Sequence, residues 1–186
     1  QPLVTASSPA TNGVLRVALA AVPDSLDPAL FVTTEAFQFG FMVYDGLLWV
    51  DHTLTPQPML AETWTHSADL LTWTFTLRQG VTFHHGTPFT AQDVVYTFTR
   101  LLDAQTGSPL RTTLQFIDKA EALDDYTVVL RLHTPNMDLP LLLGAAQVRI
   151  VAHDYTSKQL VAKPSGTGPF RVAERVGDER ISFVRN

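Results

Sequence analysis

Alternating apolar and polar positions predict several strands in this chain. In residues 72–78, two aromatic side chains and a leucine alternate with threonines, which is the period of a strand with one buried face. Two short apolar runs, residues 14–19 and 148–151, also favour strands. The remaining strands are expected over residues 61–65, 116–122, 127–132, 170–173 and 180–184. We expect these segments to form three hairpins, the first between residues 61–65 and 72–78.

Apolar positions three and four apart predict helices, and the strongest such pattern lies in residues 90–102. Thr90 and Asp93 have the spacing of a capping box, with Asp in place of the preferred Glu or Gln. The apolar stripe consists of Val94, Val95, Phe98, Leu101 and Leu102. Together these features indicate an amphipathic helix with one buried face.

A second helix is expected to begin at Thr34 and to stop near Gly46. Thr33 is an N-cap residue type, and Phe37 and Phe41 lie four residues apart on one helix face. Shorter helices are expected over residues 139–143 and 155–162. The predicted fold class is therefore mixed, α/β or α+β, without an internal repeat.

Composition favours a folded, acidic chain. With 45% hydrophobic residues among 186, the chain can bury a core, which excludes disorder as its main state. The 13 basic and 18 acidic residues give a net charge of −5, so we expect no nucleic-acid or anionic-membrane partner. Because cysteine is absent, disulfides and thiolate zinc sites are excluded. Residues 1–12 are small and polar, and we expect a flexible leader without signal-peptide features.

The chain offers little that indicates catalysis. It has no G-x-S-x-G elbow, and residues 165–168 lack the lysine and the following helix of a phosphate loop. His84 and His85 are adjacent, so on a strand they would point to opposite faces, and we interpret them as turn or surface residues rather than metal ligands. Asp27 and other turn carboxylates are expected to cap backbone donors. We therefore expect no catalytic residue, no metal and no cofactor.

Three stretches carry a resemblance to a known family. The longest joins L-A-E-T-W, at residues 60–64, to a continuous segment at residues 73–96 that contains F-H-H-G-T-P-F-T-A-Q-D-V-V. The others are S-L-D-P with Y-D-G-L, at residues 25–28 and 44–47, and G-T-G-P-F at residues 166–170. In order and spacing these stretches resemble the extracellular solute-binding proteins of family 5, which serve ABC importers of oligopeptides, dipeptides or nickel chelates.

The resemblance implies a fold and a domain organisation. Members have a two-lobed, type II periplasmic-binding-protein-like fold and are more than twice as long as this chain. By resemblance, residues 13–44 and 166–186 belong to the discontinuous core of lobe I, residues 45–165 form an α/β subdomain inserted there, and lobe II is absent. We therefore expect an N-terminal fragment. Leu70 stands where the family usually has a turn glycine, so that turn is expected to change type.

The resemblance also implies a function. The family captures a peptide, a peptide-like solute or a metal chelate between its lobes and delivers it to membrane permease subunits, outside the cytoplasm. The residues expected to bind ligand are Phe31, Val32, Thr33, Thr34, Leu110, Arg111 and Arg149. Either arginine could pair with a ligand carboxylate, and a surface salt bridge is the alternative for each. For residues 32–34 the alternative is helix capping.

Two other functions stay open at this stage. One is a hydrolase that uses Ser, His and Asp side chains from separate strands. The other is a self-contained extracellular module that binds a ligand or a carbohydrate. In addition, the sheet is expected to be unfinished after Val184, and an unpaired sheet edge favours a dimer.

Overall fold

The computed structural model describes residues 13–19, 21–145 and 148–186. Its helices are α1 (Thr34–Val43), α2 (Ala91–Leu102), α3 (Leu110–Leu114), α4 (Leu139–Ala145) and α5 (Ser157–Ala162), with short 3-10 turns at Pro28–Leu30 and Ala104–Thr106. Its strands are β1 (Leu48–Val50), β2 (Pro56–Pro58), β3 (Ala61–His66), β4 (Thr72–Leu77), β5 (Ile117–Asp124), β6 (Thr127–Leu132), β7 (Phe170–Val176) and β8 (Arg180–Arg185). The mixed α and β class is thus confirmed.

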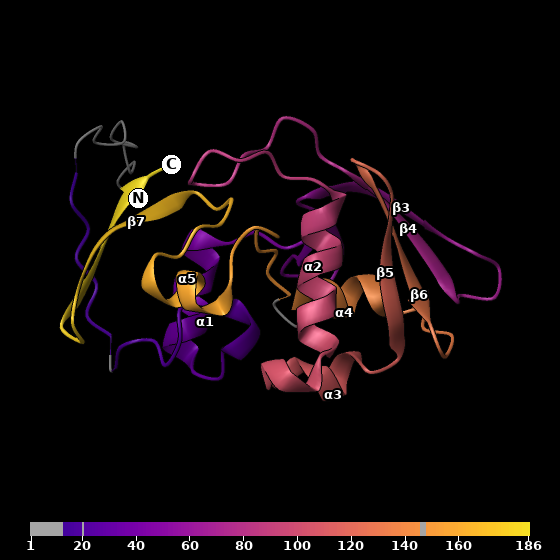
Figure 1. Ribbon diagram of the computed structural model, residues 1–186, viewed down its shortest axis with the longest axis horizontal. Helices are drawn as coiled ribbons and strands as arrows, with labels where there is room; N and C mark the ends of the chain where they lie inside the picture. Colours follow the sequence, from indigo (N-terminus) through magenta and orange to yellow (C-terminus); the bar gives the residue numbers. More distant parts are fainter. Residues whose placement is uncertain (1–12, 20, 146–147) are drawn as a thin grey trace, which may run out of the picture.

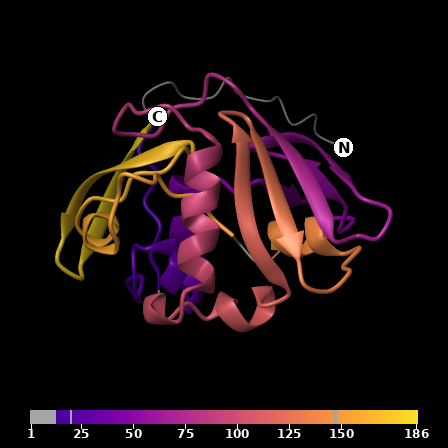
Figure 2. The ribbon, with the colours of Figure 1, turned by 45° about the vertical axis from the view of Figure 1, so that its right-hand side comes forward.

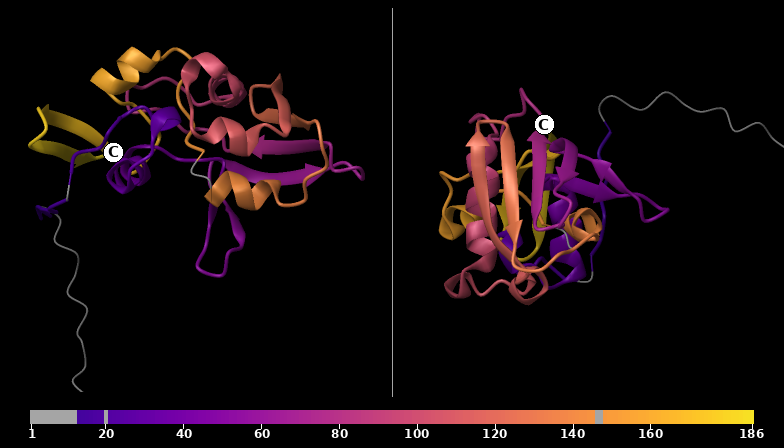
Figure 3. Two further views of the ribbon diagram at one scale, coloured as in Figure 1. Left: turned by 90° about the horizontal axis from the view of Figure 1, so that it is seen from below. Right: turned by 90° about the vertical axis from the view of Figure 1, so that its right-hand side faces the viewer.

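A four-stranded antiparallel sheet forms the larger half of the molecule. Its strand order is β3-β4-β6-β5, and the predicted pairs β3–β4 and β5–β6 are its two hairpins. Helix α2 packs against β5 and β6 on one side of this sheet (Figure 2). The small β1–β2 hairpin packs against α4 and projects from the body (Figure 3).

The predicted patterns of β4 and α2 are both confirmed. Trp73, Phe75 and Leu77 are buried, and they face the core together, because alternate residues of a strand share a face. At the start of α2, the Asp93 Oδ2 atom accepts a hydrogen bond from the Thr90 backbone N–H at 2.7 Å, within a capping box. The short side chain of Asp therefore performs the role usually given to Glu.

The smaller half of the molecule is built from α1, α5 and the β7–β8 hairpin (Figure 1). Helix α1 begins at Thr34, as expected, but it ends at Val43, before Gly46. Its buried face consists of Ala36, Phe39, Gly40 and Val43, whereas Phe41 is 57% exposed. The Phe31 ring lies so close to α1 that a Cβ added to Gly40 would be 2.7 Å from it, which explains why the Gly40 side of the helix turns inward.

Two predicted strands are wrong. Residues 14–19 contain no strand among those described, and Val14 and Leu15 are 83% and 86% exposed. No described strand pairs with them, and an extended segment needs such a partner to be stable. Residues 148–151 are buried but not in a sheet; the Ile150 N–H donates instead to the Asp45 carbonyl at 2.9 Å. A short apolar run indicates that a segment is buried, but it does not distinguish a strand from a buried irregular segment.

The turn at Leu70 also differs from the prediction. Leu70 itself has a φ of 58°, so the turn keeps the left-handed position that glycine usually occupies. The Leu70 N–H donates to the Ser67 carbonyl at 3.0 Å, and the next N–H, of Leu71, donates to Asp69 Oδ1 at 3.0 Å. These hydrogen bonds offset the strain of a leucine in this conformation.

Two separate groups of buried side chains form the core. One lies between the four-stranded sheet, α2 and α4, and the other joins α1, α5 and the inner face of the β7–β8 hairpin. The two core groups do not follow the predicted division at residues 45–165, since Val151 and Leu160 pack in the second group and Ala29 packs in the first. The domain boundaries stay a prediction. Within the described part of the chain, no helix is both long enough and apolar enough to cross a membrane.

Candidate functional site

Arg149 is the most unusual of the residues expected to bind ligand. It is only 5% exposed, and its guanidinium carbon lies 4.4 Å from the centre of the Phe41 ring. None of the ion pairs between described residues includes it. Burial lowers the pKa of Arg149 to about 10, against an opposing influence of the Asp45 charge. The side chain is therefore charged at neutral pH, and among the described residues no carboxylate lies at ion-pair distance from it. None of its nitrogen atoms is both buried and without a hydrogen-bond partner, so the guanidinium still reaches the surface.

The backbone around Arg149 is held against the segment that follows α1. The Ile150 N–H donates to the Asp45 carbonyl, and a Cβ added to Gly46 would lie 2.8 Å from the Val148 carbonyl oxygen. The Asp45 carboxylate in turn accepts a hydrogen bond from the Thr167 hydroxyl at 2.9 Å. The Y-D-G-L and G-T-G motifs thus fix the position of Arg149.

The loop before α1 separates into buried and exposed residues. Phe31 is 3% exposed and packs edge-on against Phe37 and Phe39, so its side chain belongs to the core. Val32 is 63% exposed, and Thr34 is exposed as well. Phe31 therefore positions the loop, and the residues after it are the ones that face outward.

Thr33 performs the capping role that was its alternative interpretation. Its Oγ1 atom accepts the Ala36 N–H at 3.3 Å and donates to Asp24 Oδ1 at 2.8 Å. Capping leaves the first N–H groups of α1 directed out of the helix, where the positive end of its dipole lies. Phe41, which contacts Arg149, is seven residues beyond Thr34, or about 10 Å along the helix axis. Helix α1 therefore connects the loop to Arg149.

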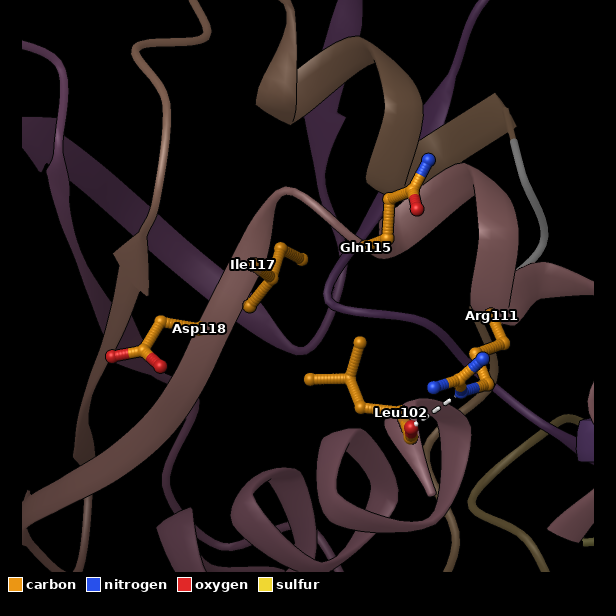
Figure 4. A pocket seen from close by; sticks show the side chains of 5 residues that line it. All are labelled: Leu102, Arg111, Gln115, Ile117 and Asp118. Carbon is orange, nitrogen blue, oxygen red and sulfur yellow. Dashed lines mark hydrogen bonds between the residues drawn. The ribbon is translucent and has the colours of Figure 1, made fainter. Parts of the chain in front are cut away.

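Leu110 and Arg111 lie on α3, next to the end of α2. Leu110 is partly buried against the larger core. Arg111 is exposed, and its Nε atom donates to the Leu102 carbonyl, the last of α2, at 2.9 Å (Figure 4). Beside them a pocket of about 210 Å³ is lined by Leu102, Arg111, Gln115, Ile117 and Asp118. None of the ion pairs between described residues includes Arg111, which was the alternative considered for it. The Arg111 side chain instead caps the C-terminus of α2.

The structure brings these predicted residues to one side of the molecule but not into one pocket. Helices α1 and α3 both lie along the lower edge in Figure 1. Arg149 contacts Phe41 of α1, and the loop at residues 32–34 leads into the same helix. The pocket beside Arg111 is lined by none of these residues.

A buried ion pair was missed by sequence reasoning. Asp27 is fully buried and caps the Ala29 N–H, as expected of a turn aspartate, but its Oδ2 atom also lies 2.5 Å from an Nη atom of Arg100. Arg100 donates as well to the Ser157 hydroxyl on α5 at 2.6 Å. The pair joins the S-L-D-P motif to α2 and α5. No local spacing could have revealed it, because its partners are 73 residues apart.

His84 packs within turns, as the sequence indicates. Its Nδ1 atom accepts the Gly166 N–H at 3.3 Å and its Nε2 atom donates to the Gly168 carbonyl at 2.9 Å, an arrangement that requires the neutral ring. Burial is the main cause that lowers the pKa of His84 below 6.5. Both ring nitrogens are thereby used to hold the G-T-G turn.

The hydrolase alternative has one geometric feature in its favour. The His85 ring lies 2.6 Å from the Ser165 hydroxyl through Nδ1 and 3.5 Å from the Asp154 carboxylate through Nε2. However, Ser165 is 2% exposed, and the Thr87 hydroxyl lies closer to Nε2, at 2.7 Å. The contact joins the turn at His84 and His85 to the segment before the G-T-G motif. Among the described residues, no group of three or more His, Asp or Glu side chains is placed to hold a metal ion.

Comparison with known proteins identifies the family. The sequence model of the bacterial extracellular solute-binding proteins, family 5, matches residues 55–186. The chain belongs to this family. The match includes two of the three stretches that carried the resemblance, residues 60–64 with 73–96 and the G-T-G-P-F turn, whereas S-L-D-P and Y-D-G-L precede it. Its members are solute-binding proteins.

The similar proteins include some that are named as peptide-binding and some that are named as nickel-binding. The chain is 30% identical to di/tripeptide-binding protein 2 of Pseudomonas aeruginosa, over 92% of this chain and 37% of the relative. It is 32% identical to the nickel-binding periplasmic protein of Escherichia coli, over 87% and 32%. The solved structure of the periplasmic binding protein DppA from Helicobacter pylori, in complex with the peptide STSA, superposes with a TM-score of 0.79 at 32% identity, over 89% of this chain and 38% of that one. The chain thus spans about a third of these relatives and has part of the periplasmic-binding-protein fold.

Proposed function

We propose that this chain contributes the first-lobe half of a solute site in the substrate-binding component of an ABC importer. The solute would be a peptide, a peptide-like compound or a metal chelate, captured between two lobes and passed to permease subunits. The observation that supports this most is the place of Arg149 in a member of a solute-binding family: the residue is 5% exposed, and no described carboxylate lies at ion-pair distance from it. A guanidinium in such a place is able to pair with a carboxylate of a ligand.

In this proposal, Arg149 pairs with a carboxylate of the solute. A guanidinium matches a carboxylate with two parallel hydrogen bonds, and the Phe41 ring beneath it orients the guanidinium plane. The exposed loop at residues 32–34 supplies a surface along which the backbone of an extended peptide lies. Leu110 and Arg111, on the neighbouring α3, would contact the other end of a longer solute. Binding needs no covalent step, and closure of the lobes follows from the contacts that only the closed state makes.

The location and the partner follow from the same proposal. The relatives are named as periplasmic proteins, so we place this protein outside the cytoplasm and expect it to dock on membrane permease subunits. The self-contained binding module is the competing proposal. It predicts that the chain alone binds a solute tightly, whereas half of a two-lobed site binds weakly.

The test is an NMR titration of the ¹⁵N-labelled chain with trialanine, with trialanine amide and with the nickel–histidine chelate. We expect weak, saturable shifts at Val32, Thr34 and the Arg149 side chain with at least one carboxylate-bearing ligand, and loss of these shifts in Arg149→Gln. Arg175→Gln, on the exposed β7–β8 hairpin, is the matched control and should bind normally. Equal binding of the peptide and its amide, or unchanged binding by Arg149→Gln, would contradict the proposed role.

A further inference from the structure

A second pocket lies away from the proposed solute site. It has a volume of about 320 Å³ and lies between the β7–β8 hairpin, the turn at His84 and His85 and the segment after α5. None of the residues at positions 31–34, 110, 111 or 149 lines it. It also shares no lining residue with the pocket beside Arg111.

The mouth of this pocket carries two positive charges. Lys163 ends α5 and Arg171 lies on β7; both are exposed, and neither takes part in an ion pair between described residues. Arg171 lies near enough to His84 to disfavour its protonation. Two carboxylates also lie near the pocket: Asp154 is 3.5 Å from His85 Nε2, and the charge of Asp45 acts on His84 more strongly than that of Arg171 does. In a chain with a net charge of −5, two neighbouring cations without partners favour an anionic ligand.

The walls of the pocket are rigid and flat. The His85 ring lies 4.5 Å from the Tyr155 ring and at 33° to it, and it is fixed by the hydroxyls of Ser165 and Thr87. His84 is held by two backbone groups of the G-T-G turn. A wall whose side chains are already immobilised loses little entropy when a ligand binds. Tyr155, partly exposed at the pocket, offers an aromatic surface to a planar group.

We propose that this pocket binds a small organic anion, with a carboxylate or phosphate group held between Lys163 and Arg171 and a planar body against Tyr155. The cations fix the charged end through charge-assisted hydrogen bonds, and the aromatic wall holds the apolar end. The site needs no second lobe, because every group that it uses lies in the described part of this chain. Its occupancy is therefore independent of the solute site at Arg149.

The experiment is an NMR titration of the chain with benzoate, phenyl phosphate and uncharged benzyl alcohol at constant ionic strength. We expect saturable shifts of the His84 and His85 resonances with one or both anions, and none with benzyl alcohol. Saturation by benzoate alone identifies a carboxylate ligand, and saturation by phenyl phosphate alone identifies a phosphate. Lys163→Gln and Arg171→Gln should each raise the dissociation constant about tenfold.

The matched control is Lys158→Gln, an exposed lysine of α5 that does not line the pocket, and it should bind as the native chain does. Since all three positions are exposed, each variant is expected to keep the native amide spectrum. The proposal is overturned if neither anion saturates, if benzyl alcohol binds equally well, or if the double variant Lys163→Gln/Arg171→Gln binds as tightly as the native chain.

Discussion

Arg100 and Arg149 are both buried, yet their surroundings differ. Arg100 is 8% exposed and meets the Asp27 carboxylate and the Ser157 hydroxyl. Arg149 is 5% exposed and faces an aromatic ring, and none of the ion pairs in the described part of the chain includes it. Because a buried charge is costly unless it is paired, the first arginine stabilises the fold only as long as its partner is present. The second is expected to oppose stability.

Asp27→Ala tests the first of these arginines. The substitution leaves the Arg100 charge buried without its carboxylate and removes the cap of the Ala29 N–H, so the free energy of unfolding should fall by about 3–5 kcal/mol. Urea unfolding followed by circular dichroism measures the loss. Asp178→Ala breaks the exposed Arg175 pair and should change stability by less than about 0.5 kcal/mol. Similar losses in the two variants would refute a special role for the buried pair.

Arg149→Met tests the second arginine, with the opposite sign. Methionine keeps the apolar contact with Phe41 but removes the desolvated charge, so the stability should be unchanged or higher by about 1 kcal/mol. The same urea titration measures it. A loss of more than about 2 kcal/mol would show that Arg149 is a structural residue with a partner of its own. Solute binding, by contrast, should be lost in this variant.

What the sequence could predict at single residues depended on whether the partner was close in the chain. The Asp93 capping box and the Asp27 turn cap use neighbours within three residues, and both are observed. The contact of Asp27 with Arg100 and that of His84 with Gly166 join positions more than 70 residues apart. Periodicity and capping rules describe local backbone geometry, so they contain no information on such pairs.

At the scale of elements, periodicity predicted β4 and α2 because each has one buried and one exposed face. It also predicted α1 as a helix from Thr34, but it did not identify the fully buried side, which Phe39 and Val43 form while Phe41 is exposed. When a helix is apolar on several sides, its sequence pattern does not identify the side that is buried. Residues 148–151 show the same limitation, since their burial between the two core groups resembles that of a strand.

The turn elements at His84 and Gly166 predict a pH dependence. The folded state lowers the pKa of His84 below the 6.5 of the free side chain, so the unfolded state binds more protons at mildly acidic pH. Stability from this group is complete above about pH 6.5 and decreases as the pH falls toward the folded pKa. Urea midpoints at pH 7.5 and 5.5 should therefore differ, and the difference should be smaller in His84→Gln.

His52→Gln, at an exposed histidine, is the control for this effect and should keep the native pH dependence. The proton resonances of the His84 ring give a direct measurement in the same pH range. If the ring titrates at or above 6.5, the hydrogen bonds to the G-T-G turn do not enforce the neutral form.

At the scale of the whole molecule, the family could be predicted from sequence motifs but not from the alternation of apolar and polar residues. Pattern alone gave a mixed α and β chain without catalytic features, whereas the long segment at residues 73–96 led to family 5, and the family match includes it. The arrangement of two core groups came only from the structure. The chain spans 37% of its di/tripeptide-binding relative.

Two exposed features of the whole molecule favour self-association. Val14, Leu15 and Val17 are 83%, 86% and 69% exposed in an extended segment without a described partner. The β7–β8 hairpin forms a two-stranded sheet by itself, so among the described residues its outer edges are unpaired. An apolar extended segment and a free sheet edge are complementary, because one can join the other as an added strand.

We therefore expect the chain to form dimers or larger species as its concentration rises, measured by size-exclusion chromatography with light scattering. Val17→Lys places a charge in the extended segment and should shift the chain toward the monomer, because added strands tolerate an inward charge poorly. Val161→Lys, at a 41% exposed valine of α5, alters the surface equally and should leave the association unchanged. A native chain that stays monomeric at millimolar concentration would contradict strand addition. Association that both lysine variants retain equally would show that another surface causes it.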